Sequence, residues 1–404
     1  MSDSCADHHL LILHHSMRAG GAERVAASLA AWWLGQGRRV TLVTLAGSAH
    51  DAYPLPAGVR RIALGLARES HGPIGALAGN LQRYRAVRRV LRSERPDIVL
   101  GMMTRPSIMA VLAAHGLGAR VVATEHSHPP ARRLPRFWAF LRRQTYPRAY
   151  AVVALTRRSA QWLDTHVPGV RARVIPNAVA WPIPGGEPVC PVPGSGDRPF
   201  VLAVGRLHPV KGFDCLIRAF ARVADAQPQW DLVILGEGAE RPALESLRDQ
   251  LGLQHRIQLP GRVGNVSDWY AAARLYVLSS RTEGLPNSLL EAMAAGLPCL
   301  AFDCETGPAD IIRDGVDGVL VPERQNDTAL AAAMARLMAD PALRAQLARR
   351  APEVLQRFEL ARVMSLWEAL FRGDPEPGDD AEPASVTDLA SGSELAYGAK
   401  DPIP

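Results

Sequence analysis

Residues 200–213 read FVLAVGRLHPVKGF, an apolar run followed by a polar loop and the beginning of a helical pattern. Residues that are apolar at successive positions are typical of strands buried on both faces of a parallel sheet. Helical periodicity continues over 213–226, so this stretch predicts a strand, a short connection and a helix. The same alternation recurs along most of the chain, which predicts an α/β protein built of parallel βα units.

The predicted strands form two groups. We expect strands at 10–14, 39–45, 97–102, 120–124 and 151–155 in the first group, and at 200–205, 231–236, 257–260, 275–279, 299–302 and 318–321 in the second. Residues 181–199 hold six prolines and four glycines, which is incompatible with a helix or a central strand. We therefore predict two Rossmann-like, doubly wound domains, 1–180 and 200–352, that face each other across a cleft, with 181–199 as the linker.

The end of the chain differs in composition from the two predicted domains. An amphipathic segment covers about 353–372. Residues 373–404 are acidic and rich in proline, glycine and serine, so we expect a disordered acidic tail there.

Composition and charge limit the class of protein. The 404-residue chain is 48% apolar with a net charge of +6, which fits a globular protein with sizeable cores. No uncharged apolar run approaches the roughly 18 residues of a membrane span, and the amino terminus carries no signal-peptide pattern, so we expect a cytoplasmic protein. The five cysteines are scattered without a CxxC pair, which argues against a disulfide framework or a zinc site.

The stretch RTEGLPNSLLEAMAAGLP, residues 281–298, predicts a helix whose start binds an anion. Pro286 suits the first turn, and the side chains of Asn287 and Ser288 are expected to satisfy free backbone donors. Glu283 precedes the helix and Glu291 lies roughly 7–8 Å along it, at about 1.5 Å per residue. These carboxylates suit the hydroxyls of a group attached to a phosphate. The alternative is a capped helix with two ordinary surface glutamates.

Two cations follow the strand predicted at 200–205. Arg206 and Lys211 lie on one strand-to-helix loop, between Gly205 and Gly212, which leave room for a ligand to approach the backbone. A guanidinium fork and a compact ammonium suit a diphosphate. Lys211 is one of only two lysines in the chain, the other being Lys400. The alternative is a solvated loop charge.

Two features of the first domain face the same predicted cleft. Gly20 and Gly21 lie between a strand and a helix, where backbone amides can approach an anion. His126 follows the strand at 120–124, although a histidine in such a place is slightly more often structural than functional.

In order along residues 1–372, these stretches resemble the retaining nucleotide-sugar glycosyltransferases of family 4, which have the two-domain GT-B architecture. The matched features are the GGAER stretch at 20–24, His126, the VIPN stretch at 174–177, Gly205 to Leu207 with Lys211 and Gly212, the GEG stretch at 236–238, and the pair Glu283 and Glu291.

The resemblance implies a role for each matched position. Arg206 and Lys211 would bind the donor diphosphate and stabilise its charge as it leaves. Glu283 and His126 would contact the donor sugar, and these four are the predicted catalytic residues. Residues implied in donor binding, through side chain or backbone, are Gly21, Gly205, Arg262, Val263, Gly284, Leu285, Pro286, Asn287, Ser288, Leu289 and Glu291. The segment at 353–372 would cross back to the first domain.

Fixed cations at the leaving phosphate interact more strongly with the transition state than with the substrate, so this chemistry requires neither metal nor cofactor. Asp303 and Glu305 have the DxD spacing of metal-dependent transferases, but they lie downstream of the glutamate pair, and we interpret them as structural. His126 and His128 do not make a convincing metal site.

The first 180 residues hold 25 basic and 9 acidic residues, and this excess needs an explanation. A helix over 134–143 would place Leu134, Phe137, Trp138 and Leu141 within a roughly 100° arc. Such a helix suits an anionic membrane surface, unless its aromatic residues pack on the domain's own core. The basic patch predicted here comprises Arg132, Arg133, Arg136, Phe137, Trp138, Leu141, Arg142 and Arg143. A nucleic acid is the rival partner, but no nucleic-acid-binding motif accompanies the charge.

The sequence thus predicts a retaining, metal-independent glycosyltransferase that moves a hexose or N-acetylhexosamine from a nucleotide diphosphate sugar, with UDP expected from the resemblance, to a membrane-associated glycan. The acceptor would be lipid-linked or part of a lipopolysaccharide, and the protein would bind the inner face of the cell membrane peripherally. The alternatives are a same-fold enzyme with a soluble acceptor, a nucleotide-sugar epimerase, or a catalytically silent subunit that binds sugar nucleotides.

Overall fold

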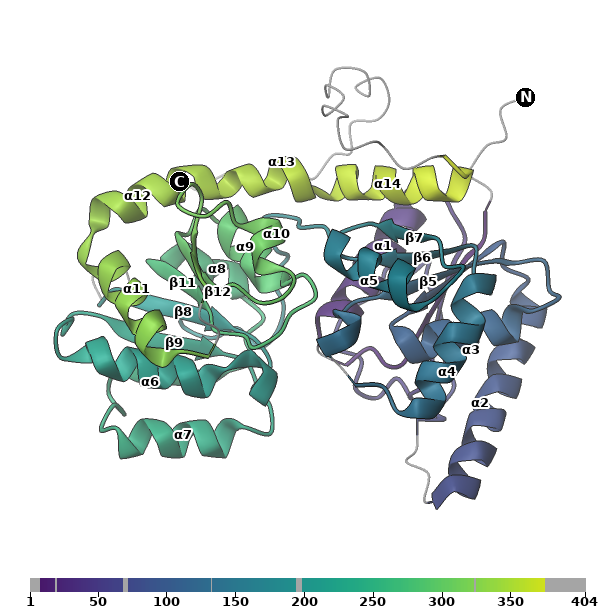
Figure 1. Cartoon of the computed structure of the whole chain (residues 1–404), viewed down its shortest axis with the longest axis horizontal. Coiled ribbons are helices and arrows are strands. Elements are labelled where there is room, and N and C mark those ends of the chain that lie inside the picture. The colour runs from purple at the N-terminus through teal and green to yellow at the C-terminus, as the bar shows by residue number, and fades with distance from the viewer. Residues whose placement is uncertain are drawn as a thin grey trace, which may run out of the picture.

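A computed structural model describes residues 8–18, 20–67, 72–131, 133–193, 198–322 and 325–374. Two α/β domains lie side by side, and the carboxyl-terminal helices run across both of them (Figure 1). The predicted fold class, two doubly wound domains, is confirmed. Arg132 and all but the first two residues of the predicted acidic tail lie outside the described residues.

The first domain contains a parallel sheet of seven strands in the order β3-β2-β1-β4-β5-β6-β7. Its strands are β1 (Leu10–His14), β2 (Val40–Thr44), β3 (Arg60–Ala63), β4 (Ile98–Met102), β5 (Arg120–Glu125), β6 (Ala151–Ala154) and β7 (Ala172–Val174). Strands β1, β2, β4 and β6 are buried along their whole length, as the apolar runs predicted. The two edge strands, β3 and β7, were not predicted, because they are short and partly exposed and lack an apolar run.

Helices cover the first sheet. They are α1 (Gly21–Gly35), α2 (Gly72–Glu94), α3 (Thr104–Ala114), α4 (Arg136–Thr145) and α5 (Arg157–His166). The strand order reverses between β1 and β4, and ligands of open α/β sheets bind beyond the strand ends at such a switch point.

The second domain repeats this plan with a parallel sheet of six strands in the order β10-β9-β8-β11-β12-β13. Its strands are β8 (Phe200–Val204), β9 (Asp231–Leu235), β10 (Ile257–Gly261), β11 (Leu275–Leu278), β12 (Cys299–Phe302) and β13 (Val319–Val321). Its helices are α6 (Phe213–Ala224), α7 (Arg241–Gln250), α8 (Val266–Ala272), α9 (Asn287–Ala294), α10 (Pro308–Ile311), α11 (Asp327–Ala339) and α12 (Pro341–Arg350). Each of these six strands lies within two residues of its predicted position.

The carboxyl-terminal segment is two helices rather than one, α13 (Val354–Phe358) and α14 (Leu360–Arg372), because Glu359 between them is extended. Helix α14 packs on the core of the first domain, where the rings of Trp33 and Trp367 meet edge to face at 6.1 Å. The indole nitrogen of Trp33 also donates to a Glu368 carboxylate oxygen over 3.1 Å. Helix α14 therefore joins the carboxyl-terminal segment to the first domain.

The described part of the linker lies along the second domain. Ser267 exchanges two hydrogen bonds with the backbone of Ile183, and Asn265 exchanges two with the backbone of Cys190. A methyl group on Gly264 would collide with the carbonyl oxygen of Gly186, so the linker approaches the loop after β10 at a position where only glycine fits. Among the described residues, no helix combines the length and apolar character that a bilayer crossing requires.

Candidate active site

Lys211 and Glu283 are in contact, although 72 positions separate them in the chain. Lys211 ends the short 3₁₀ turn η4 (Pro209–Lys211), and Gly212 follows in the left-handed region with φ +63°. The ammonium Nζ donates to Oε1 of Glu283 over 2.6 Å. The two side chains are 20% and 10% exposed. The two charges are therefore largely withdrawn from solvent and neutralise each other.

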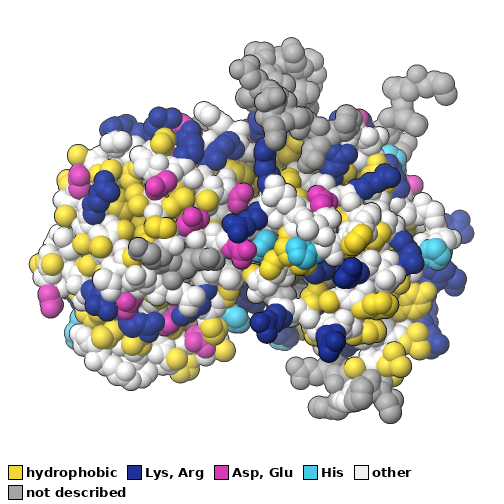
Figure 2. Space-filling view, in the orientation of Figure 1, with side chains coloured by type: hydrophobic (Ala, Val, Ile, Leu, Met, Phe, Trp, Pro, Cys, Tyr) yellow, Lys and Arg dark blue, Asp and Glu magenta, His cyan; other side chains and the backbone are white. Residues whose placement is uncertain are grey.

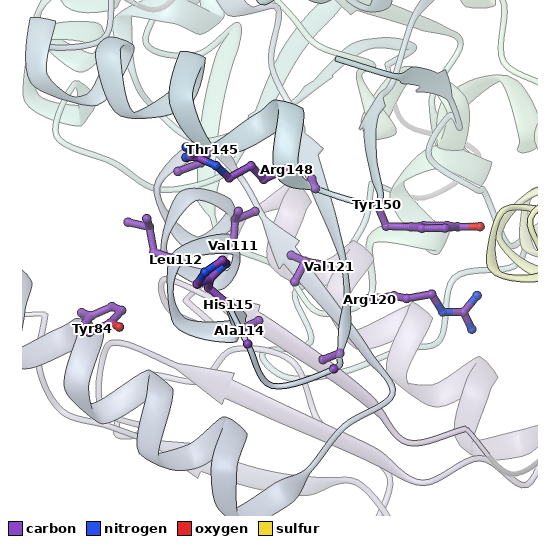
Figure 3. A pocket seen from close by; sticks show the side chains of 14 residues that line it. Tyr84, Val111, Leu112, Ala114, His115, Arg120, Val121, Thr145, Arg148 and Tyr150 are labelled. Carbon is purple, nitrogen blue, oxygen red and sulfur yellow. The ribbon is translucent and has the colours of Figure 1, made fainter. Parts of the chain in front are cut away.

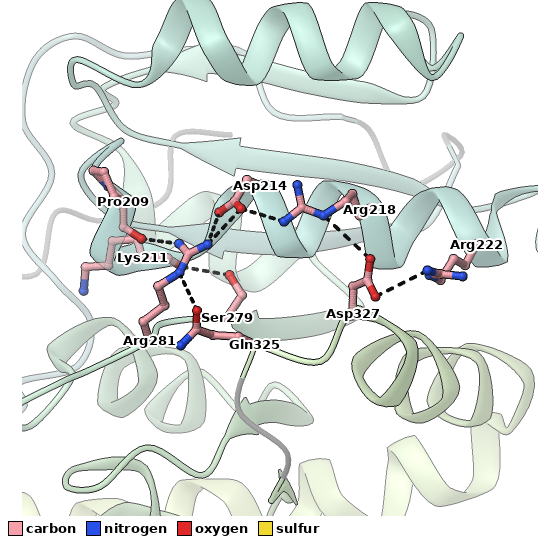
Figure 4. Close-up of polar contacts among 9 residues, drawn as sticks. All are labelled: Pro209, Lys211, Asp214, Arg218, Arg222, Ser279, Arg281, Gln325 and Asp327. Carbon is pink, nitrogen blue, oxygen red and sulfur yellow. Dashed lines mark hydrogen bonds and ion pairs between the residues drawn. The ribbon is translucent and has the colours of Figure 1, made fainter.

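The turn that carries Lys211 is held by the end of β11 (Figure 4). The hydroxyl of Ser279 donates to the carbonyl oxygen of Lys211 over 2.9 Å, and the amide of Arg281 donates to Val210 O over 2.8 Å. A side chain on Gly212 would collide with Ser279 O. The glycine is thus required twice, by its positive φ and by this close approach.

The loop after Glu283 packs directly against the first domain. A methyl group on Gly284 would collide with the carbonyl oxygen of His126, and one on Gly307 would come within 2.8 Å of Gly284 O. The hydroxyl of Thr306 donates to Glu283 O over 2.7 Å. The absence of side chains at Gly284 and Gly307 therefore lets the loop that carries Glu283 pack close to the backbone of His126.

His126 lies at the carboxyl end of β5 with both ring nitrogens buried and, within the described residues, without hydrogen-bond partners. Burial, with a smaller contribution from the neighbouring His14, lowers the pKa of His126 to about 3. Burial likewise lowers the pKa of His14, at the end of β1, to about 4. Both imidazoles are therefore neutral at physiological pH.

Arg206 is exposed, and its charge acts on Glu23 in the first turn of α1. Burial raises the pKa of Glu23 above its usual value, and the positive charge of Arg206 opposes that rise. The predicted diphosphate-binding arginine is therefore within electrostatic range of a carboxylate that belongs to the other domain.

The beginning of α9 differs from the prediction. Asn287 and Ser288 do not cap the helix: Pro286 is the N-cap and makes no side-chain cap hydrogen bond. Asn287 Oδ1 instead accepts from Asn177 Nδ2 over 2.8 Å, and its Nδ2 donates to Gly21 O over 3.4 Å, whereas the Ser288 hydroxyl accepts from Tyr276 over 2.8 Å. The asparagine therefore links the helix start to the first domain.

Two amides in the first turn of α9 have partners within the chain, since those of Leu289 and Leu290 donate to Pro286 O over 3.1 and 3.2 Å. The predicted role of Leu289 in donor binding remains a prediction. The side chains of Leu285 and Leu289 pack in the core of the second domain. The backbone of the predicted donor-binding stretch meets the first domain at Gly284, beside His126 O, and at Leu285, whose carbonyl oxygen accepts from Asn177 Nδ2 over 3.3 Å.

Glu291 is 5% exposed and joins the two domains. One of its carboxylate oxygens pairs with Arg24 of α1, and the other accepts from the Tyr270 hydroxyl over 3.1 Å. Sequence reasoning missed both partners. Arg24 was within the quoted GGAER stretch, but nothing local indicated that its side chain reaches across the cleft.

The remaining donor-binding predictions fall at strand ends. A methyl group on Gly205 would lie 3.4 Å from Lys211 Cε, so Gly205 lies directly beside the lysine side chain, and a larger residue there would limit the space around it. Arg262 and Val263 follow β10, next to the linker, with Arg262 exposed and Val263 half-buried. Their predicted contact with the nucleotide base remains a prediction.

The basic patch only partly has the expected arrangement. Trp138 and Leu141 pack against the core around Tyr146, and Arg142 is 7% exposed, with its guanidinium 3.8 Å from a Glu125 oxygen. The prediction that these three face a membrane is wrong, because this side of α4 faces α3. On α4, Phe137 and its unpredicted neighbour Phe140 are the exposed aromatic residues. Figure 2 shows basic side chains spread over the first domain with few acidic ones among them.

Glu305, in the stretch with DxD spacing, lies 3.5 Å from Nε2 of His128 and 3.5 Å from Arg158, both of the first domain. No group of three or more potential metal ligands occurs in the part of the chain that the structure describes.

A cavity of about 720 Å³ lies elsewhere in the first domain (Figure 3). Tyr84, His115 and Arg148 line it together with residues at the start of β5. It is formed at the amino ends of the strands, whereas the candidate site follows their carboxyl ends. The cavity is therefore separate from the candidate site.

Comparison with known proteins agrees with this geometry. Residues 19–180 match the family model described as Glycosyltransferase Family 4, and residues 192–354 match Glycosyl transferases group 1. An exopolysaccharide phosphotransferase of Streptomyces coelicolor is 34% identical over 70% of this chain, but the match spans only 29% of that protein. An alpha-1,4-N-acetyl-D-galactosaminyltransferase of Campylobacter jejuni, named for an undecaprenol-diphosphate-linked glycan, is 27% identical over 73% of this chain and 80% of its own length.

Solved structures share the whole fold. Sucrose-phosphate synthase from Thermosynechococcus elongatus superposes with a TM-score of 0.78 and 22% identity over 91% of this chain and 98% of its own. Anabaena HepE in complex with UDP has a TM-score of 0.71 and 19% identity over 90% of this chain and all of its own. Fold and site thus define a two-domain protein of the GT-B type. The chain belongs to the family 4 and group 1 glycosyltransferases.

Proposed function

We propose that this chain is a retaining, metal-independent glycosyltransferase. It moves a hexose or N-acetylhexosamine from a nucleotide diphosphate sugar, in the first instance a UDP-sugar, to a membrane-associated acceptor in polysaccharide, lipopolysaccharide or lipid-linked glycan synthesis. The observation that carries this proposal is the 2.6 Å contact between Lys211 and Glu283, beside a loop that packs on His126.

The proposed chemistry uses each of these groups. When the bond between the sugar carbon and the diphosphate oxygen breaks, its electron pair goes to the leaving oxygen, and positive charge develops on the sugar. In this proposal Lys211 and Arg206 stabilise the leaving diphosphate, and the Glu283 carboxylate stabilises the positive charge that develops on the sugar. The acceptor hydroxyl attacks from the face that the diphosphate leaves, and its proton passes to a phosphate oxygen.

A neutral His126 suits the sugar side of this site. An imidazolium there would oppose the positive charge of the transition state, whereas a neutral ring can donate or accept a hydrogen bond with a sugar hydroxyl. The low pKa of His126, caused by burial, keeps the ring neutral.

Similar proteins support the choice of donor and acceptor. HepE is described in complex with UDP, and the Campylobacter relative is named for a transfer of N-acetylgalactosamine to a glycan on undecaprenol diphosphate. We propose the same classes of donor and acceptor here. The exposed Phe137 and Phe140, on a helix with Arg136 and Arg143, support peripheral binding to the inner face of an anionic membrane.

A panel of nucleotide sugars tests the proposal. The purified chain is screened by thermal shift against UDP, UDP-hexoses, UDP-N-acetylhexosamines and GDP-mannose, and bound donors are then incubated with membrane lipid extract with and without a chelator. We expect transfer to lipid that persists with the chelator and keeps the anomeric configuration. Transfer to a soluble sugar alone would favour a soluble acceptor, and release of an isomerised sugar would favour an epimerase. Donor binding without any turnover would favour a catalytically silent subunit.

A further inference from the structure

The side chain of Arg281, two residues before Glu283, reaches the turn that carries Lys211 (Figure 4). Its Nη2 donates to both carboxylate oxygens of Asp214, over 2.9 and 2.8 Å, and its Nε donates to Gln325 Oε1 over 3.2 Å. Its Nη1 donates to the carbonyl oxygen of Pro209. One guanidinium thus spans the first turn of α6, the turn η4 and the segment before α11.

Every carbonyl group of η4 accepts a hydrogen bond from the segment that follows β11. Pro209 O accepts from the Arg281 guanidinium, Val210 O from the Arg281 amide, and Lys211 O from the Ser279 hydroxyl. Glu283, which contacts the Lys211 ammonium, lies two residues beyond Arg281. The backbone of Lys211 and the partner of its side chain are therefore fixed by one five-residue segment, 279–283.

The charge of Arg281 is compensated on the side away from Lys211. Burial alone would disfavour the charged form of Asp214, but hydrogen bonds from Arg281 and Arg218 outweigh it and lower the pKa of Asp214 below its usual value. One nitrogen of Arg281, Nη2, bridges both oxygens of this carboxylate, while Nη1 and Nε donate to Pro209 O and Gln325 Oε1. A planar guanidinium therefore contacts three elements at once in a fixed geometry, which a compact lysine ammonium does not reproduce. The contact with Asp214 thus helps to set the direction in which Arg281 reaches Pro209.

We propose that Arg281 is a positioning residue that acts through Lys211. By holding the carbonyl groups of η4, it keeps the Lys211 ammonium beside Glu283, where the leaving diphosphate gains its charge. This inference rests on the proposed function for its catalytic consequence, but the placement of Lys211 can be measured without any turnover.

The kinetic test is a double-mutant cycle. Arg281→Lys and Arg281→Ala are each made in the natural chain and in Lys211→Ala, with Arg222→Lys as the matched control, because Arg222 lies in the same network but contacts Asp327 rather than η4. We expect kcat to fall by about tenfold or more in the natural background, the scale of a misplaced catalytic group, with a smaller change in donor KM. We expect little further loss where Lys211 is already absent. An equal loss in both backgrounds would overturn the proposal.

The second test reads Lys211 directly and needs no donor. Since Lys211 and Lys400 are the only lysines, acylation of each is quantified by mass spectrometry, with Lys400 as the internal reference. We expect Arg281→Ala to increase the relative labelling of Lys211 several-fold, and Arg222→Lys to leave it unchanged. Unchanged labelling in Arg281→Ala would refute the positioning role, whereas a natural chain without any transfer activity would refute only the proposed function.

Discussion

Replacing Lys211 with alanine tests the contact on which the proposed mechanism depends. The ammonium lies 2.6 Å from a Glu283 carboxylate that is 10% exposed, so its removal leaves a largely buried negative charge without this partner. Loss of one preorganised electrostatic group costs turnover about 10²–10³-fold, which corresponds to about 2.7–4 kcal/mol of transition-state stabilisation. We expect that loss in kcat for transfer from the UDP-sugar, with the fold retained.

The same change also affects stability, and this separates the two roles of the lysine. An unsatisfied buried polar group costs about 1–3 kcal/mol, so we expect a lower free energy of unfolding in urea for Lys211→Ala. Adding Glu283→Gln removes the stranded charge and is expected to restore part of the stability without restoring kcat. Lys400→Ala is the control. A kcat within threefold of the natural value in a folded Lys211→Ala chain would refute the reasoning.

Three further predictions follow from other contacts. Glu291→Ala is expected to raise the donor KM and the Kd for UDP more than it lowers kcat, because we propose, as the family resemblance implies, that this carboxylate binds the nucleotide ribose; calorimetry with an unchanged Kd would contradict that role. Phe137→Ser with Phe140→Ser is expected to reduce flotation with anionic vesicles while sparing turnover of a soluble acceptor analogue, and equal flotation would remove these residues from a membrane contact. Burial lowers the pKa values of His14 and His126 to about 4 and about 3. Below pH 6.5 the unfolded chain therefore binds more protons than the folded chain. The free energy of unfolding is expected to be lower at pH 5 than at pH 7.5 by about 2 kcal/mol per histidine. Equal stability at the two pH values in urea unfolding would contradict this prediction.

The sequence predicted those parts of the fold that are encoded by neighbouring residues. The strands β1, β8 and β11 are buried on both faces, so each leaves an uninterrupted apolar run. Edge strands such as β3 leave no such run, because solvent covers part of their side chains.

Helical periodicity predicted an apolar arc on α4 but not what covers it. Trp138 and Leu141 pack inward, whereas Phe137 remains exposed, because the position of α3 decides which part of the arc is buried. The predicted caps at Asn287 and Ser288 failed for a similar reason. Their side chains find partners in Asn177 and Tyr276, which are distant in sequence.

What the chain determined by itself was therefore the two parallel sheets, the linker between them and the residue types of a diphosphate and sugar site at the strand ends. Only the tertiary structure decided that Lys211 contacts Glu283 and that Arg24 pairs with Glu291. It also decided that Arg281 holds η4, the turn that carries Lys211. Local patterns follow from the backbone geometry of a few adjacent residues. These contacts join residues that lie 70 or more positions apart, and they depend on how whole elements pack.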